Sequence, residues 1–255
     1  MANQVVLLGK EDRTGIITIN RPDVRNSLNE DVFRQLNDIL DQAARNEGIR
    51  AVVITGAGNA FVSGADINEL LGYDTQHGWA ASRFQQSVFN RLERLGKPSI
   101  AAINGPALGG GLELALSCTL RVASVKAKLG FPEIGLGIIP AFGGTQRLVR
   151  SVGYPKATEL LLFRSIISAE EACKIGLVNQ VVEQGQVVDR AKEMAATLCA
   201  LSPVAVCLEL ELLLHTANQG FDLGLALESA LAALAVSSEE AKQLLGGFLS
   251  KRKEP

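Results

Sequence analysis

The sequence predicts an α/β fold followed by an all-helical C-terminal region. Two short runs, residues 51–55 and 99–103, are apolar apart from Thr55 and Ser99, as is typical of strands buried between helices. Stretches with helical periodicity separate such runs along the chain, and this alternation favours an α/β core. From about Ser202 onward only helical periodicity remains. We therefore expect a core over residues 1–200 and a helical region over residues 201–255.

The individual elements follow from apolar patterns and from the residues that begin or end them. Strands are expected at residues 5–8 and 16–20, around a turn at residues 11–15. Asn26 or Ser27 is expected to cap a helix over residues 30–44, with Val32, Leu36 and Leu40 on one face. Further along, we expect a loop at 56–64, a helix within 82–95, a strand at 99–103, a glycine-rich turn at 104–111, a helix at 112–117, strands at 121–124 and 128–129, and helices from 145 onward that are interrupted by a strand within 176–182.

Composition and charge argue against several classes of partner. The formal net charge is −2, and no basic stripe suited to a phosphate backbone is present, so nucleic acid is not expected as a partner. No apolar stretch has the roughly 20 residues that span a bilayer, so no membrane partner is expected either. Four cysteines without metal or redox spacing indicate a reducing compartment, and we expect a soluble, cytoplasmic protein. The 47% apolar content favours an oligomer.

Common cofactor and metal motifs are not matched. Gly56-Ala57-Gly58 follows a predicted strand and resembles the start of a dinucleotide-binding turn, but Phe61 stands where a third glycine is needed. The two histidines, His77 and His215, match no ligand spacing. The sequence therefore favours neither a nicotinamide site nor a metal site.

A first candidate for chemistry is the run from Ala107 to Leu114, in which three glycines precede Glu113. Consecutive glycines permit close approach of the backbone, and free N–H groups at the start of a helix favour developing negative charge. Glu113 follows within the first helical turn and has apolar neighbours. A carboxylate there also interacts favourably with the helix dipole, which is an equally good explanation from sequence alone.

A second candidate is Glu133, the single charge between Phe131 and Pro140. A buried carboxylate is costly unless it is hydrogen-bonded, paired or protonated. The alternative is a loop glutamate exposed to water. Two isolated carboxyl groups are more suggestive together, because a water held between them can lose a proton to one while the other donates a proton.

Over nearly its whole length the chain resembles the crotonase, or enoyl-CoA hydratase/isomerase, superfamily. The resemblance depends on many blocks in the same order, which is far more specific than one glycine-rich patch. The blocks are Asn20-Arg21-Pro22 with residues 26–28, residues 54–56, 63–67, 98–105, 107–114, 131–137 and 143–148, Gly176-Leu177-Val178, and Phe248 with Lys251-Arg252.

The resemblance implies a spiral of repeated ββα units, with C-terminal helices that pack the chains into trimers or into hexamers built from two trimers. It also implies an acyl-CoA thioester as substrate and no cofactor, because coenzyme A is part of that substrate. Family hydratases carry glutamates at the positions of Glu113 and Glu133. The implied reaction is a syn-hydration of a 2-enoyl-CoA in fatty-acid or related metabolism, with the backbone N–H groups of Ala65 and Gly110 as an oxyanion hole.

Contacts with coenzyme A follow from the resemblance in the same way. The segment containing Ser63, Gly64, Asp66 and Ile67 is expected near the adenine, and Arg25 near the phosphates. Phe248 and Lys251 are expected to reach coenzyme A, in some family members from a neighbouring subunit. A surface position for Arg25 and a packing role for Phe248 are alternative explanations.

Three departures from the family pattern affect these expectations. Thr119 stands where aspartate is usual, Ala141-Phe142 stand where small residues follow the proline, and Leu244 and Gly247 replace residues that are usually Gly and Ala. Phe142 is expected to contact the acyl group and to favour short chains. An isomerase, a branched-chain hydratase of the methylglutaconyl type, and a crotonase-fold protein that binds RNA remain alternatives.

Overall fold

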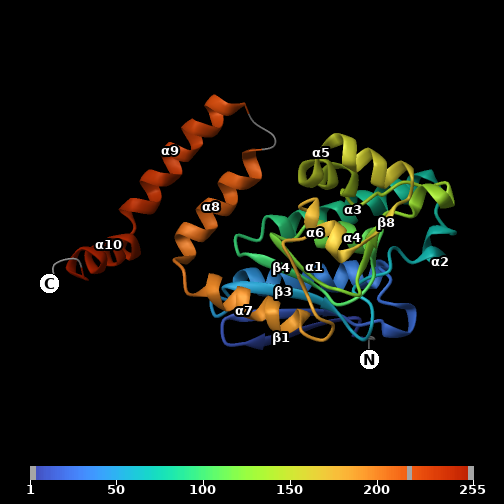
Figure 1. The fold of residues 1–255 in the computed structure, drawn as a ribbon, viewed down its shortest axis with the longest axis horizontal. Coiled ribbons are helices and arrows are strands. Elements are labelled where there is room, and N and C mark those ends of the chain that lie inside the picture. Colours follow the sequence, from blue (N-terminus) through green and yellow to red (C-terminus); the bar gives the residue numbers. More distant parts are fainter. Residues whose placement is uncertain (1–3, 217–219, 252–255) are drawn as a thin grey trace.

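The computed structural model describes residues 4–216 and 220–251, and within these residues a six-stranded sheet crosses the core (Figure 1). Its strand order is β1-β2-β3-β4-β6-β9; β1 and β2 are antiparallel, and every later neighbour is parallel. A second, three-stranded sheet has the order β5-β7-β8. The strands are β1 (Val6–Glu11), β2 (Thr14–Ile19), β3 (Ala51–Gly56), β4 (Ser99–Ile103), β5 (Ala107–Leu108), β6 (Leu120–Ser124), β7 (Lys128–Gly130), β8 (Ile166–Ser168) and β9 (Gln180–Val182).

Helices cover both faces of the large sheet. They are α1 (Glu30–Arg45), α2 (Ile67–Leu70), α3 (Thr75–Glu93), α4 (Gly110–Leu116), α5 (Gly144–Leu162), α6 (Ala169–Lys174), α7 (Val187–Cys199), α8 (Pro203–Thr216), α9 (Phe221–Ser237) and α10 (Glu239–Lys251), with short 3₁₀ helices η1 (Pro22–Val24) and η2 (Glu133–Leu136). Because side chains alternate along a strand, Val52 and Ile54 of β3 face the side of α1, α3 and α4, whereas Ala51 and Val53 face α7. This is why residues 51–54 of the strand are all apolar.

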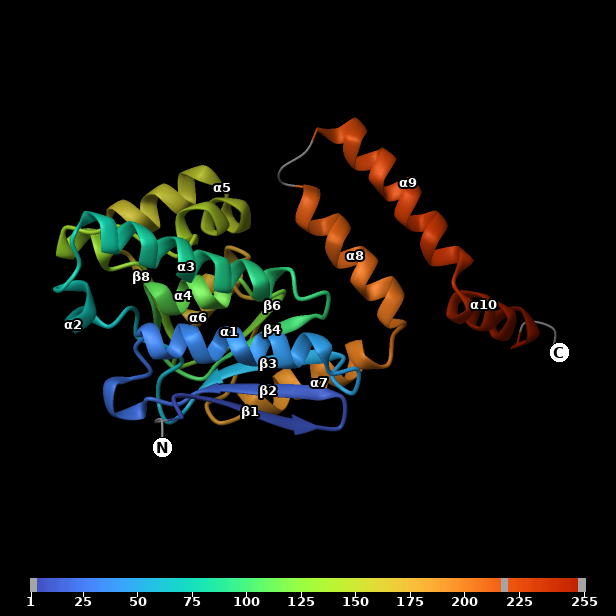
Figure 2. The same cartoon turned by 180° about the vertical axis from the view of Figure 1, so that it is seen from behind.

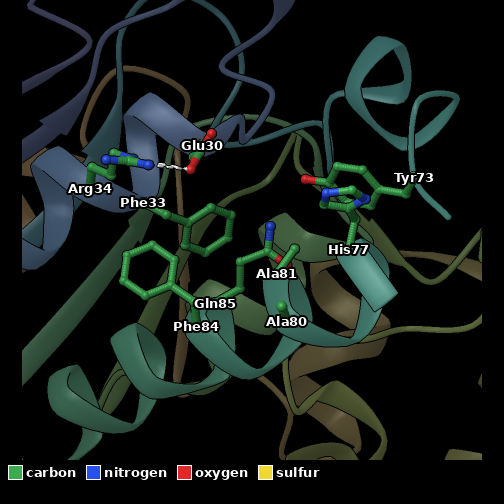
Figure 3. Close-up of a pocket in the computed structure, with 9 residues that line it drawn as sticks. All are labelled: Glu30, Phe33, Arg34, Tyr73, His77, Ala80, Ala81, Phe84 and Gln85. Atoms are coloured by element: carbon green, nitrogen blue, oxygen red, sulfur yellow. Dashed lines mark hydrogen bonds and ion pairs between the residues drawn. The ribbon is translucent and has the colours of Figure 1, made fainter. Parts of the chain in front are cut away.

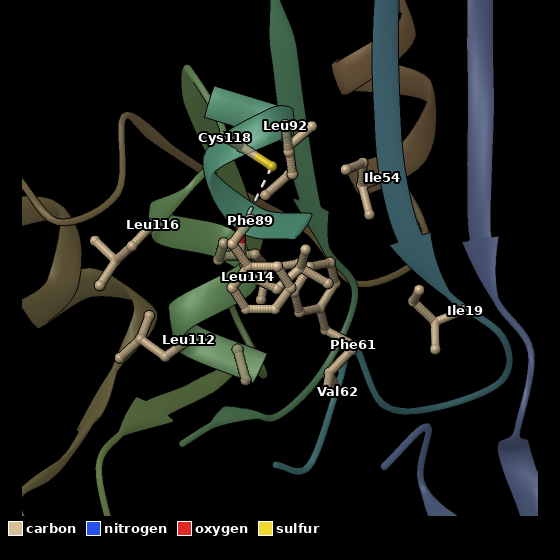
Figure 4. Close-up of a cluster of buried hydrophobic side chains, with 14 of the residues drawn as sticks. Ile19, Ile54, Phe61, Val62, Phe89, Leu92, Leu112, Leu114, Leu116 and Cys118 are labelled. Atoms are coloured by element: carbon tan, nitrogen blue, oxygen red, sulfur yellow. Dashed lines mark hydrogen bonds between the residues drawn. The ribbon is translucent and has the colours of Figure 1, made fainter. Parts of the chain in front are cut away.

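Helix α4 lies in the middle of the larger apolar cluster. All of its residues are buried, and Leu112, Leu114 and Leu116 pack in the same cluster as Phe61 and Phe89 (Figure 4). A close-packed interior tolerates little displacement of the groups it encloses. Any polar side chain on α4 is therefore held in a fixed position.

The last three helices differ from the core in their burial. In Figures 1 and 2, α8, α9 and α10 extend away from the sheet, and none of their described side chains is buried. Large apolar residues are exposed on them, among them Phe221, Leu244 and Phe248. Among the described helices, none alone has the length and apolar character to cross a membrane. Two bent pairs, α7 with α8 and α9 with α10, reach that length and apolar character only when the helices of a pair are taken together.

The α/β fold class predicted from the sequence is confirmed, and so are its main strands, but the expected cap of α1 is wrong. Asn29 caps this helix, because its side chain accepts a hydrogen bond from the Val32 N–H at 3.1 Å. Asn26 is buried in the preceding loop, where its side-chain amide donates to the carbonyls of Ala57 and Ala60. The polar side chain thus stabilises a contact between distant loops rather than the helix.

Other elements also differ from the prediction. Helix α3 begins at Thr75, because the Asp74 side chain accepts from the His77 N–H at 2.7 Å and caps the helix before the expected start. Helix α4 begins at Gly110, inside the glycine run, since packing of the backbone outweighs the low helix propensity of glycine there. Strand β8 was not predicted; it is only three residues long and pairs with β7.

Candidate active site

Glu113 projects from α4 and is held by a turn formed by residues 141–144. Its Oε1 accepts two backbone hydrogen bonds, from the N–H of Phe142 at 2.8 Å and from the N–H of Gly144 at 2.6 Å. The residue is only 1% exposed. A β-carbon at position 144 would lie 2.6 Å from Cγ of Glu113, so glycine is required for this approach. The carboxyl group is therefore bound by a specific turn, and interaction with the helix dipole alone does not explain its position.

Glu133 begins η2 and is 9% exposed, so the alternative of a water-exposed loop glutamate is wrong. Within the described residues, its buried Oε2 has no hydrogen-bond partner. The other oxygen, Oε1, lies against Gly109, where a β-carbon would come within 2.5 Å of it. Gly109 also has a φ of 51°, which non-glycine residues rarely adopt. The glycine run thus allows the second carboxyl group to approach the start of the helix that carries the first.

The proton affinities of both carboxyl groups are raised. Burial raises the pKa of Glu113 to about 7, although the N–H groups of Gly144 and Phe142 oppose this shift; the charge of Glu133 raises it further and that of Arg147 lowers it. Burial also raises the pKa of Glu133 to about 7. Near neutral pH one group can therefore accept a proton while the other donates one.

The two residues predicted for the oxyanion hole come from neighbouring segments. Val62 pairs with Ala107 in an isolated parallel bridge, which brings the segment before Ala65 beside the segment before Gly110. Among the described residues, neither the Ala65 N–H nor the Gly110 N–H donates a hydrogen bond. Both donors are thus available to an added oxygen atom, as such a site requires. Their role stays a prediction.

The segment predicted to bind coenzyme A packs against the loop that precedes α1. The Ser63 N–H donates to the Arg25 carbonyl at 3.1 Å, and Arg21 donates to Oδ2 of Asp66 from both terminal nitrogens at 3.0 Å. The Asp66 carboxylate is therefore engaged by Arg21, which was not predicted as a site residue. Arg25 is exposed beside it; Gly64 is buried and Ile67 is exposed.

Phe142 contributes to the site through its backbone, while its ring packs in the core. The ring lies edge-on to Phe33 and Phe89, with centroid distances of 5.2 and 6.0 Å. The ring also borders Gly110, where a β-carbon would lie 2.7 Å from its Cε2. Whether it contacts the acyl group, as expected from the sequence, stays a prediction.

Beyond this aromatic group lies a hollow of about 500 Å³ between α1 and α3 (Figure 3). Phe33 lines it and is thus shared with the ring cluster of Phe142. In Figure 3, Tyr73 and His77 lie at one side of the hollow and the ion pair of Glu30 and Arg34 at the other. The remaining lining residues are Ala80, Ala81, Phe84 and Gln85. The lining thus combines apolar side chains with the polar side chains of Glu30, Arg34, Tyr73, His77 and Gln85.

The C-terminal residues predicted to contact coenzyme A do not lie beside the two glutamates within this chain. Phe248 is on α10, which extends away from α4 within this chain, and it is 59% exposed (Figure 1). The side chain of Lys251 lies outside the described residues. Among the described residues, no group of three or more His, Cys, Asp or Glu side chains could hold a metal ion.

Comparison with known proteins identifies the family of the chain. The family model of enoyl-CoA hydratase/isomerase matches residues 10–255. The chain is 43% identical to the short-chain-enoyl-CoA hydratase of Clostridium acetobutylicum, with 97% of this chain and 95% of that protein covered. It is 38% identical to the crotonyl-CoA hydratase of Syntrophomonas wolfei, with 99% and 98% covered.

Solved structures show the same fold. The enoyl-CoA hydratase of Bacillus anthracis superposes with a TM-score of 0.93 at 35% identity, and 97% of each chain is covered. A hydratase subunit from Geobacillus kaustophilus also gives 0.93, at 38% identity, with 98% of this chain and 96% of that chain covered. Sequence, fold and the two enclosed glutamates agree, and the chain belongs to the enoyl-CoA hydratase/isomerase family.

Proposed function

We propose that the protein is an enoyl-CoA hydratase, a hydro-lyase that reversibly adds water to a short-chain 2-enoyl-CoA to give the 3-hydroxyacyl-CoA. The observation that carries this proposal is the pair of buried carboxyl groups, Glu113 and Glu133, each with a pKa raised to about 7. The names of the relatives from Clostridium and Syntrophomonas support the same reaction. No cofactor is required, since coenzyme A is part of the substrate.

The different surroundings of the two carboxyl groups suggest different roles. Hydrogen bonds to a carboxylate favour its ionised form, and Glu113 accepts two of them. Glu113 therefore takes a proton from the water as the water oxygen attacks the β-carbon. Glu133, whose Oε2 has no partner within the described residues, favours the protonated form and donates its proton to the α-carbon. The N–H groups of Ala65 and Gly110 bind the thioester oxygen as it becomes enolate-like.

We assign binding of coenzyme A to Arg25 and to the segment with Ser63, Gly64, Asp66 and Ile67. Phe248 and Lys251 contact it from a neighbouring subunit of a homotrimer or hexamer. The exposed apolar residues of α8, α9 and α10 support such an assembly, because large apolar faces are usually covered by a partner. A cytoplasmic location, and the absence of nucleic-acid and membrane partners, stay predictions.

The test is turnover of enoyl-CoAs of graded chain length. Purified protein should remove the enoyl-thioester absorbance of crotonyl-CoA, and kcat/KM should fall as the chain lengthens, because the Phe142 ring fills the space between Gly110 and Phe33, which lines the hollow. A protein that leaves crotonyl-CoA unchanged but converts a 3-enoyl-CoA into its conjugated isomer would be an isomerase and would contradict the proposal.

The predicted preference for short acyl chains can be tested with a variant of Phe142. Phe142→Ala should raise the ratio of kcat/KM for octenoyl-CoA to that for crotonyl-CoA about tenfold, since one or more methylene contacts at about 1 to 3 kcal/mol become possible. Phe142→Leu, which retains much of the volume, is the matched control and should change the ratio less. An unchanged ratio in Phe142→Ala would show that this ring does not limit the chain.

A further inference from the structure

The turn that holds Glu113 is itself held by a buried arginine. Arg147, in the first turns of α5, is 5% exposed, and its Nη1 donates to the Phe142 carbonyl at 3.1 Å. The N–H of the same Phe142 donates to Glu113. One residue of the turn therefore connects the guanidinium to the carboxyl group through a short, direct path.

Helix α3 fixes the guanidinium in turn. Arg147 Nη2 donates to Asn90 at 2.6 Å and to Oε2 of Glu93 at 2.9 Å, and its Nε donates to the same Glu93 oxygen at 3.2 Å. A buried charge is tolerated when it is paired and its donors are satisfied. The planar guanidinium can meet three acceptors in fixed directions, which a lysine cannot do.

The same face of α3 also holds the start of the turn. The Ser82 hydroxyl and the Gln86 amide both donate to the Ala141 carbonyl, at 2.7 and 2.9 Å. Ser82, Gln86 and Asn90 follow at intervals of four residues, so they lie along one side of the helix. This side of α3 thus binds two successive carbonyls of the turn, one directly and one through Arg147.

We propose that Arg147 is a positioning residue for Glu113. Anchored by Asn90 and Glu93, it fixes the turn of residues 141–144 so that the N–H groups of Phe142 and Gly144 converge on one carboxylate oxygen. The inference rests on the proposed function, because it assigns Glu113 the role of a base. The charged groups that act on Glu113 are Arg147 from α5 and Glu133 from η2, and Glu93 of α3 balances Arg147.

The test compares Arg147→Met with Arg150→Met, which removes the same charge from an exposed position of the same helix. For crotonyl-CoA, Arg147→Met should lower kcat roughly 10- to 100-fold, because a small displacement of a base is costly. KM should stay within about twofold, because Arg147 does not touch the substrate in this account. The acid limb of the pH profile should move to higher pH, since the positive charge of Arg147 lowers the pKa of Glu113.

Two more variants separate positioning from general stability. Arg147→Lys keeps the charge and should restore the position of the acid limb, with only part of kcat. Glu93→Gln removes the anchor and should lower kcat in the same direction by a smaller factor; it also serves if Arg147→Met does not fold. A kcat in Glu93→Gln equal to that of the wild type would overturn the inference.

The inference and the proposed function fail in different ways. If the wild type hydrates crotonyl-CoA but Arg147→Met behaves like Arg150→Met, the positioning role is wrong and the proposed function stands. If the loss of kcat in Arg147→Met follows only the loss of folded protein, with the acid limb unmoved, the role is again wrong. A wild type without hydratase turnover would refute both.

Discussion

The turn of residues 141–144 and the short helix η2 each contribute to one half of the site, and they surround its carboxyl groups with different partners. The turn gives Glu113 two backbone donors and is held by Arg147. Helix η2 places Glu133 against Gly109 and, among the described residues, leaves its Oε2 without a donor. Both groups are buried but they are not equivalent, because donors aimed at a carboxylate favour its ionised form.

The largest expected effect comes from removing either carboxyl group. Glu113→Gln and Glu133→Gln should each lower kcat for crotonyl-CoA by about 10³-fold, since each removes one general acid or base. The double variant should be little worse than either single variant, because groups that act as a unit are not additive. Steady-state kinetics measures this, with coenzyme A binding as the check on folding.

Glu183→Gln, an exposed substitution on the surface, is the matched control and should retain turnover. The comparison between the two halves of the site would break if Glu113→Gln kept near-normal turnover while Glu133→Gln lost it. That result would describe a hydratase that uses Glu133 alone.

A smaller effect concerns stability. The pKa of Glu113 is raised from 4.5 to about 7, so its contribution to stability is fully present below about pH 4.5 and is lost as the pH rises toward 7. Glu113→Gln does not titrate, and the amide oxygen can still accept from Phe142 and Gly144. Relative to the wild type, the variant should therefore gain about 3 kcal/mol of unfolding free energy between acidic and mildly alkaline pH.

Denaturant unfolding at about pH 5 and about pH 8 measures this difference. Glu183→Gln should show no such pH-dependent gain. If Glu113→Gln also gained nothing, Glu113 would be ionised at little cost in the folded protein, and its burial would not be the source of its proton affinity.

Much of the fold could be predicted because it depends on local patterns. The apolar runs of β3 and β4 are short, uniform and bounded by glycine or proline, so their burial on both faces follows from the sequence. The cap of α1 could not be predicted as easily. Asn26, Ser27 and Asn29 are all capping types, and only the loop of residues 57–60 decides that Asn26 is used elsewhere.

The candidate site was predictable in its residues but not in its contacts. Glu113 and Glu133 are isolated carboxyl groups among apolar residues, which makes them candidates, and the resemblance to family hydratases selects them. The donors to Glu113 are backbone N–H groups, which every residue except proline has, so the sequence does not reveal them. Gly143-Gly144 indicates only a turn whose backbone can approach another group closely. Arg147 lies in the block of residues 143–148 that resembles the family, but its role could not be predicted, because arginine is ordinarily a surface residue and the sequence does not show its burial.

The most direct test of the unequal pair is the pH dependence of kcat/KM for crotonyl-CoA from about pH 5 to about pH 9. The account requires Glu113 ionised and Glu133 protonated in the free enzyme. The profile should therefore be bell-shaped with its maximum near pH 7, and it should fall about tenfold per pH unit on each side. A profile in which kcat/KM does not fall on one side of the maximum would contradict the account. One of the two carboxyl groups would then not control turnover by gaining or losing a proton in this pH range.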